Sequence, residues 1–111
     1  MKPAISLIIG VYNGLSVLKF LFHNLRFQSF KEFEIIIADD DSSEKYDDFL
    51  NKYKIFFKFP IKYVWHNDDG FRKNRILNRA VYHSSADYIA FTDMDCIPHP
   101  KFIENHLKLI K

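Results

Sequence analysis

The chain has 111 residues, a length that fits one domain and is too short to expect two. Its composition, with 48% hydrophobic and 17% aromatic residues but only three Gly and four Pro, favours a globular fold and excludes disordered, collagen-like and low-complexity sequences. The formal net charge is only +2, and basic residues are spread among acidic ones, so nothing favours nucleic acid as a partner.

The amino-terminal sequence does not resemble a targeting or anchoring segment. Its apolar run, residues 5–11, is interrupted by Tyr12-Asn13-Gly14 too early for a secretory signal, and no stretch approaches the roughly 18 apolar residues of a membrane span. The single cysteine, Cys96, cannot form an intramolecular disulfide, which favours a reducing compartment. We therefore expect a cytoplasmic location, with association at the inner face of the membrane through regions outside this chain left open.

The first predicted unit is a strand followed by a helix. Residues 5–11 form a β-branched run without polar alternation, which is typical of a strand in a parallel sheet covered on both faces. A helical pattern follows, with Ser16 as its candidate cap. The expected buried stripe of this helix is Leu18, Leu21, Phe22 and Leu25.

A second unit begins with the apolar run 33–38 and ends in the acidic turn 39–43. Ser42 or Ser43 is expected to cap the helix that follows, because Ser side chains accept hydrogen bonds from free N–H groups at helix starts. The apolar positions of that helix are Tyr46, Phe49, Leu50 and Tyr53.

Two further strands are predicted at 61–66 and 88–92. The first leads through the polar turn 67–70 into a helix over about 72–84. The second ends in Asp93-Met94-Asp95 and is followed by a closing helix. The apolar stripes of these two helices are Ile76, Leu77, Ala80 and Val81, and Phe102, Ile103, Leu107 and Ile110.

This alternation predicts an α/β fold for a single domain over residues 1–111. We expect a mainly parallel sheet of about four strands, with right-handed crossovers and helices on both faces. In such sheets ligands bind beyond the carboxyl ends of the strands. The polar clusters of the chain follow those ends, at residues 12–13, 39–43, 67–70 and 93–95.

The acidic groups after the second and fourth strands would meet at one edge of the sheet. Crowded carboxylates repel one another, so they favour a shared hard cation such as Mg²⁺ or Mn²⁺, which could also bridge a diphosphate. Arg72, Lys73 and Arg75 could neutralise that diphosphate at a helix start. Solvated turns, helix capping and local ion pairs are alternative explanations for the same residues.

Four segments, taken in order, resemble glycosyltransferase family 2, the inverting enzymes with the nucleotide-sugar-binding GT-A fold. Residues 6–13 look like the opening strand of that family, and 34–42 are similar to its second strand and Asp-Asp-Gly-Ser turn. Residues 70–80 resemble its Gly…Arg-Asn-x-Ala helix, especially in chondroitin-synthase-like members. Residues 88–98 resemble the strand with the Asp-x-Asp signature.

The resemblance implies a role for each matching position. Asp40 would receive the uracil imide N–H, Asp93 would face the ribose or the sugar, and Asp95 would hold the Mn²⁺ or Mg²⁺ ion that bridges the diphosphate. The remaining nucleotide-binding positions are the backbone of Val11 and Tyr12 in the base pocket, and Arg72 and Asn78 in the bordering helix.

Three positions depart from the family pattern. Gly10 replaces the usual Pro, and Asp41 replaces a Gly that the turn favours. Leu77 stands where Arg is common, which would shift a phosphate contact onto Arg75 or Arg79.

By resemblance, the function is transfer of a sugar from a UDP-sugar to a glycan or lipid-linked acceptor with inversion, in polysaccharide biosynthesis. The family's general base lies in the acceptor half, so we expect it beyond Lys111 and expect this chain to be an inactive donor-binding portion. A non-catalytic nucleotide-binding fragment is the alternative. Receiver domains and dinucleotide-dependent oxidoreductases are disfavoured, because Tyr12-Asn13 follows the first strand and no Gly-x-Gly-x-x-Gly follows any strand.

Overall fold

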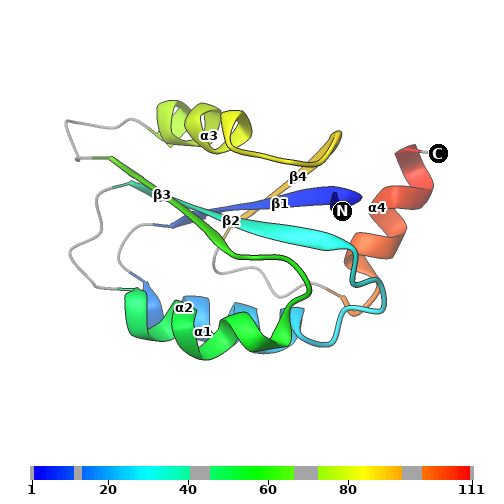
Figure 1. Cartoon of the computed structure of the whole chain (residues 1–111), viewed down its shortest axis with the longest axis horizontal. Helices are drawn as coiled ribbons and strands as arrows, with labels where there is room; N and C mark the ends of the chain where they lie inside the picture. Colours follow the sequence, from blue (N-terminus) through cyan, green and yellow to red (C-terminus); the bar gives the residue numbers. More distant parts are fainter. Residues whose placement is uncertain (1, 12–13, 41–45, 67–72, 94–98, 111) are drawn as a thin grey trace.

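The computed structural model describes residues 2–11, 14–40, 46–66, 73–93 and 99–110. Strands and helices alternate along the chain, as predicted (Figure 1). The strands are β1 (Ile5–Val11), β2 (Phe33–Asp40), β3 (Lys62–His66) and β4 (Tyr88–Asp93). The helices are α1 (Leu15–Leu25), α2 (Asp47–Tyr53), the short 3-10 helix η1 (Lys54–Phe56), α3 (Lys73–Tyr82) and α4 (Phe102–Ile110).

The four strands form one parallel sheet in the order β3-β2-β1-β4. The two inner strands, β1 and β2, are paired along nearly their whole length, from Ile5↔Phe33 to Val11↔Asp39. This confirms the predicted α/β class and the parallel sheet. It also explains why β1 has no polar alternation, since an inner strand of a covered sheet is buried on both faces.

The sheet is covered by helices on both faces (Figure 1), which also confirms the prediction. Alternate residues of a strand point to opposite faces, so each face has its own core. On one face, Ile8 and Ile36 pack with Ile76 and Ala80 of α3. The larger core on the other face joins the sheet to α1, α2 and α4, and it includes the predicted α1 stripe of Leu18, Leu21, Phe22 and Leu25.

Several boundary predictions were wrong, including one-residue differences at the start of β3 and at the end of β4. β2 extends past Ala38 to Asp40, because pairing with β3 continues through Asp39↔Trp65 and Asp40↔His66. Ser16 lies inside α1, which starts at Leu15 with Gly14 at its N-cap. The N-cap of α2 is Tyr46, so the cap position is held neither by Ser42 nor by Ser43, both of which lie outside the described residues.

The buried side chain of Gln28 fixes α4 to the segment that follows α1. Its Oε1 accepts from the N–H of Ile103 at 3.0 Å, and its Nε2 donates to the carbonyl of His99 at 2.7 Å. Ile103 and Leu107 then place one side of α4 in the larger core. No helix in the described part of the chain has both the length and the apolar character needed to cross a membrane.

A buried ionic network closes the sheet at the amino-terminal ends of its strands. The Glu34 carboxylate is 2% exposed and accepts from Ser6 Oγ at 2.5 Å and from the N–H of Ser85 at 2.6 Å. Lys62 Nζ lies 3.0 Å from Glu34 and also donates to the carbonyl of His83 at 2.7 Å. Burial alone would raise the pKa of Glu34, but these hydrogen bonds and the Lys62 charge outweigh it and hold the pKa below its ordinary value.

Candidate functional site

The carboxyl ends of three neighbouring strands bring predicted site residues to one edge of the sheet. β1 lies in the middle, with Gly10 paired to Asp93 of β4 and Val11 paired to Asp39 of β2. Asp40 is the last residue of β2. Because adjacent strands lie about 4.8 Å apart, the ends of β2 and β4 are separated by roughly 10 Å across β1. The backbones of Val11, Asp40 and Asp93 therefore share one rim.

These residues differ in how their side chains are placed. Val11 is buried, which leaves its backbone as the part that could meet a ligand, whereas Asp93 is exposed at the end of β4. The side chain of Asp40 lies outside the described parts of the chain, as do all of Tyr12, Arg72 and Asp95. The predicted roles of those four residues stay predictions.

Asn78 lies on the exposed side of α3, while Ile76 and Ala80 of the same helix are buried against the sheet. The helix packs against β1, β2 and β3. Asn78 therefore belongs to the helix that covers the sheet, but its side chain lies on the side of α3 that faces away from the strands.

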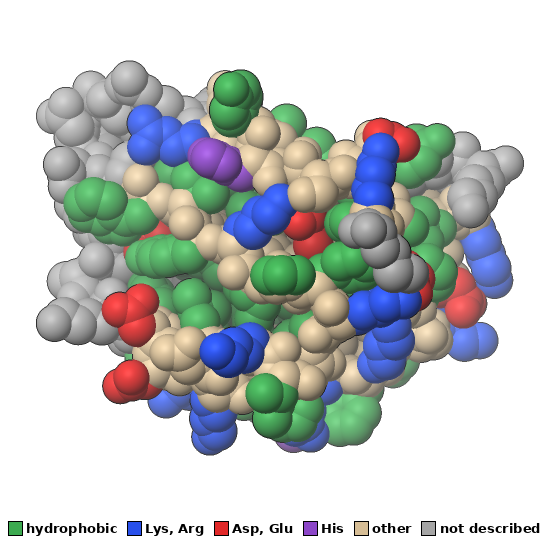
Figure 2. Space-filling view, in the orientation of Figure 1, with side chains coloured by type: hydrophobic (Ala, Val, Ile, Leu, Met, Phe, Trp, Pro, Cys, Tyr) green, Lys and Arg blue, Asp and Glu red, His purple; other side chains and the backbone are tan. Residues whose placement is uncertain are grey.

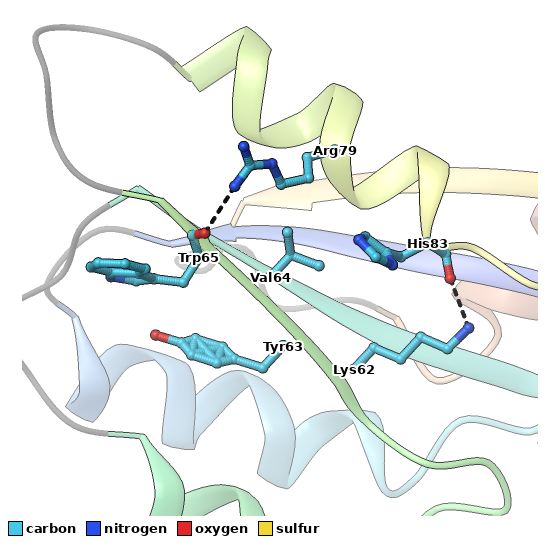
Figure 3. A pocket seen from close by; sticks show the side chains of 6 residues that line it. All are labelled: Lys62, Tyr63, Val64, Trp65, Arg79 and His83. Carbon is cyan, nitrogen blue, oxygen red and sulfur yellow. Dashed lines mark hydrogen bonds between the residues drawn. The ribbon is translucent and has the colours of Figure 1, made fainter.

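Arg79, one of the two alternative phosphate contacts, is engaged at the outer strand. Its Nη1 donates to the carbonyl of Trp65 at 3.2 Å (Figure 3). This contact belongs to an open pocket of about 470 Å³ between α3 and β3, lined by Lys62, Tyr63, Val64, Trp65, Arg79 and His83. Because Trp65 pairs with Asp39 near the end of β2, this bond holds Arg79 on the β3 side of the rim formed by β1, β2 and β4.

The charge of the pocket is smaller than its lining suggests. Lys62 is paired with Glu34 and also donates to Ser85 Oγ at 2.5 Å. Over the face shown in Figure 2, the described Lys and Arg side chains are scattered among other residues and not gathered into one patch. Among the described residues, the pocket therefore offers no concentrated positive charge for an anionic ligand.

Asp39 is a third acidic residue at the rim, and it is fully buried. Its carboxylate accepts a hydrogen bond from the hydroxyl of Tyr63 on β3. Burial, followed by this hydrogen bond and the negative charge of Asp39, raises the pKa of the Tyr63 phenol well above its ordinary value. Asp39 is therefore held by a neutral phenol that remains a donor at physiological pH.

Two features of this region could not be found from the sequence. The Asp39–Tyr63 bond joins residues 24 positions apart, and only the register Ile37↔Tyr63 shows that they are neighbours. The Glu34 network likewise depends on the register Ser6↔Glu34 and on the turn after α3. Side chains alternate between the two faces of a strand, so the sequence of Lys62–His66 could indicate only that Tyr63 lies on the face opposite Val64.

Among the described acids at the rim, Asp93 is the better placed to bind a metal ion. No group of three or more His, Cys, Asp or Glu side chains is placed to hold a metal ion among the described residues, which do not include Asp95. The exposed carboxylate of Asp93 is an oxygen ligand of the type that Mg²⁺ and Mn²⁺ prefer. Asp39 is already bound to Tyr63, so it is a poorer candidate.

Comparison with solved structures agrees with this architecture. A crystal structure of S. aureus TarS 1–349 in complex with UDP-GlcNAc has a TM-score of 0.79 and 24% identity, over 96% of this chain and 31% of that TarS chain. The mannosyltransferase PcManGT from Pyrobaculum calidifontis, in complex with GDP-Man and Mn²⁺, has a TM-score of 0.68 and 18% identity, over 88% of this chain and 29% of that protein. Both likenesses concern the fold.

Sequence comparison identifies the family. The chain is 26% identical over 107 residues to the chondroitin synthase of Escherichia coli. The matched region covers 96% of this chain but only 15% of that synthase. The chain thus spans less than a third of each of these three proteins as compared. The family model described as "Glycosyl transferase family 2" matches residues 6–111, nearly the whole chain. The chain therefore belongs to glycosyl transferase family 2.

Proposed function

We propose that this chain binds the UDP part of a UDP-sugar, within an enzyme that transfers the sugar to a glycan or lipid-linked acceptor with inversion. The observation that carries the proposal is the shared rim of β1, β2 and β4, where the backbones of Val11, Asp40 and Asp93 converge. It is supported by family membership and by the UDP-GlcNAc bound to TarS, which has the same fold.

Each rim residue then has a separate task. The backbone of Val11 and Tyr12 lines the base pocket, Asp40 accepts the uracil imide N–H, and Asp93 faces the ribose or the sugar. Arg72 and Asn78 belong to the segment that borders the nucleotide. An anionic donor suits this edge, because the acids there can share a cation with the diphosphate.

A divalent ion is part of the proposal. Asp95 would hold Mn²⁺ or Mg²⁺, and the bound ion would stabilise the charge of the leaving diphosphate. The Mn²⁺ present in the PcManGT structure supports this choice of ion.

Calorimetric titration with UDP, with and without Mn²⁺, tests the proposal. We expect binding that requires the metal and weakens sharply in Asp95→Ala and in Asp40→Ala. Asp87→Ala is the matched control. The Asp87 carboxylate is exposed and pairs with Lys2 at 2.7 Å. Asp87 directly precedes β4, so it lies at the edge of the sheet opposite the rim. Unchanged UDP affinity in both rim variants would refute the proposed site.

A further inference from the structure

Tyr63 donates a hydrogen bond to the buried carboxylate near the end of β2. An isolated buried carboxylate is strongly unfavourable, so its hydrogen-bond donors decide how it is held. Asp39 is 0% exposed, and the Tyr63 hydroxyl donates to it from the neighbouring strand. The contact joins the edge strand β3 to the inner strand β2 one residue before Asp40.

The ring of Tyr63 makes a second contact on the same face of the sheet. It packs edge-on against Tyr46, with ring centroids 6.0 Å apart. Tyr46 is 2% exposed and lies at the N-cap of α2. Tyr63 therefore contacts both the β2 residue directly before Asp40 and the N-cap residue of α2, the helix that follows β2 in the chain.

We propose that Tyr63 is a positioning residue for nucleobase recognition: its hydroxyl holds Asp39 and thereby fixes the strand end from which Asp40 reads the uracil imide. The inference rests on the proposed function, because it assigns the reading of the base to Asp40. Asp39 is fully buried in its contact with Tyr63, so it is not the residue that reads the base.

The test compares the affinity of the chain for UDP with its affinity for N3-methyl-UDP, in which the imide N–H is blocked. The wild-type chain should prefer UDP. Tyr63→Phe removes only the hydroxyl, and the UDP affinity should fall roughly ten-fold, the effect of about one lost hydrogen bond to a charged group. The affinity for N3-methyl-UDP should change little, so the ratio of the two affinities should shrink while the binding stoichiometry stays at one.

Tyr82→Phe is the matched control, because it removes the same atom from a side chain that is 86% exposed on α3. Its affinity ratio should equal that of the wild type. Asp39→Asn provides a second variant, because it keeps an acceptor oxygen for the phenol but loses the charge. Its ratio of UDP affinity to N3-methyl-UDP affinity should fall between the ratios of the wild type and Tyr63→Phe.

The outcomes separate this inference from the function on which it rests. A wild-type ratio in Tyr63→Phe overturns the positioning role, and so does a drop in stoichiometry at an unchanged ratio, which would indicate a purely structural contact. Equal affinity of the wild-type chain for the two nucleotides refutes base reading through the imide, and with it this inference, whereas the proposed binding of UDP is refuted only by unchanged UDP affinity in Asp95→Ala and Asp40→Ala.

Discussion

Replacing Glu34 with Gln should destabilise the fold far more than an equivalent change on the surface. The carboxylate accepts from Ser6, from the N–H of Ser85 and from Lys62, and it is almost fully buried. An amide of the same shape cannot accept from all three, because its NH₂ group faces at least one donor. A buried polar group left without a partner costs about 1–3 kcal/mol.

The size of the effect is limited by the exposure of Lys62. Breaking a fully buried ion pair costs roughly 3–5 kcal/mol, but the side chain of Lys62 is 33% exposed and can turn its ammonium to water. We therefore expect a loss of about 2–3 kcal/mol in the free energy of unfolding, a large part of the 5–15 kcal/mol typical of a domain. The melting temperature should fall by roughly 10 °C.

The pH dependence of the loss gives a second measurement. Because the pKa of Glu34 is lowered by folding, its contribution is present above the unfolded-state pKa of about 4.3 and is lost as the pH falls through the lower folded-state pKa. The difference in stability between wild type and Glu34→Gln should be constant above about pH 5 and shrink in more acidic solution.

Urea unfolding followed by circular dichroism between pH 3 and 8 measures both quantities. Glu32→Gln is the control, because Glu32 is two residues away and forms a partly exposed ion pair with Lys58, a type worth about 0–1 kcal/mol. Equal losses in the two variants, or a Glu34→Gln loss that does not change below pH 5, would refute this account of the network.

Two further predictions follow from burial. Leu107→Ala should cost about 2–5 kcal/mol of unfolding free energy, because Leu107 is 7% exposed in the larger core, whereas Leu109→Ala should cost little at 86% exposure; equal losses in urea unfolding would contradict the packing of α4. Tyr63→Phe should leave the rise in tyrosinate absorbance between pH 8 and 11 unchanged, because the raised pKa of Tyr63 keeps its phenol protonated there; loss of one phenolate's absorbance would contradict the Asp39 contact.

The sequence predicted the strands and helices because their apolar spacing is set by the sheet and its two helical layers. Ile5–Val11 matched the structure at both ends, since an inner strand needs apolar residues throughout its length. The misplaced end of β2 shows the limit of this reasoning. Asp39 and Asp40 continue the strand because β3 pairs with them, and strand pairing is not visible in the composition of a single segment.

The candidate site was predictable in its outline and not in its supporting contacts. The carboxyl ends of parallel strands must share an edge, so the order of Val11, Asp40 and Asp93 along the chain was enough to bring their backbones together. The partners of Asp39 and Glu34 depend on register and on side-chain direction. Tyr63 had no sequence signal that linked it to Asp39 before the register was known.

Glu34 and Asp39, the buried carboxylates among the described side chains of β2, should have separable effects when they are perturbed. Glu34 points to the α3 face near the start of the strand, and Asp39 to the opposite face near its end. Each is contacted by a residue of β3, so β2 is tied to the edge strand at both ends, but only the Asp39 end adjoins the rim. Glu34→Gln should therefore lower the melting temperature without changing the ratio of UDP to N3-methyl-UDP affinity, measured well below the melting transition. Tyr63→Phe should change that ratio, and a Glu34→Gln variant that changed it equally would show that the two ends of β2 are coupled.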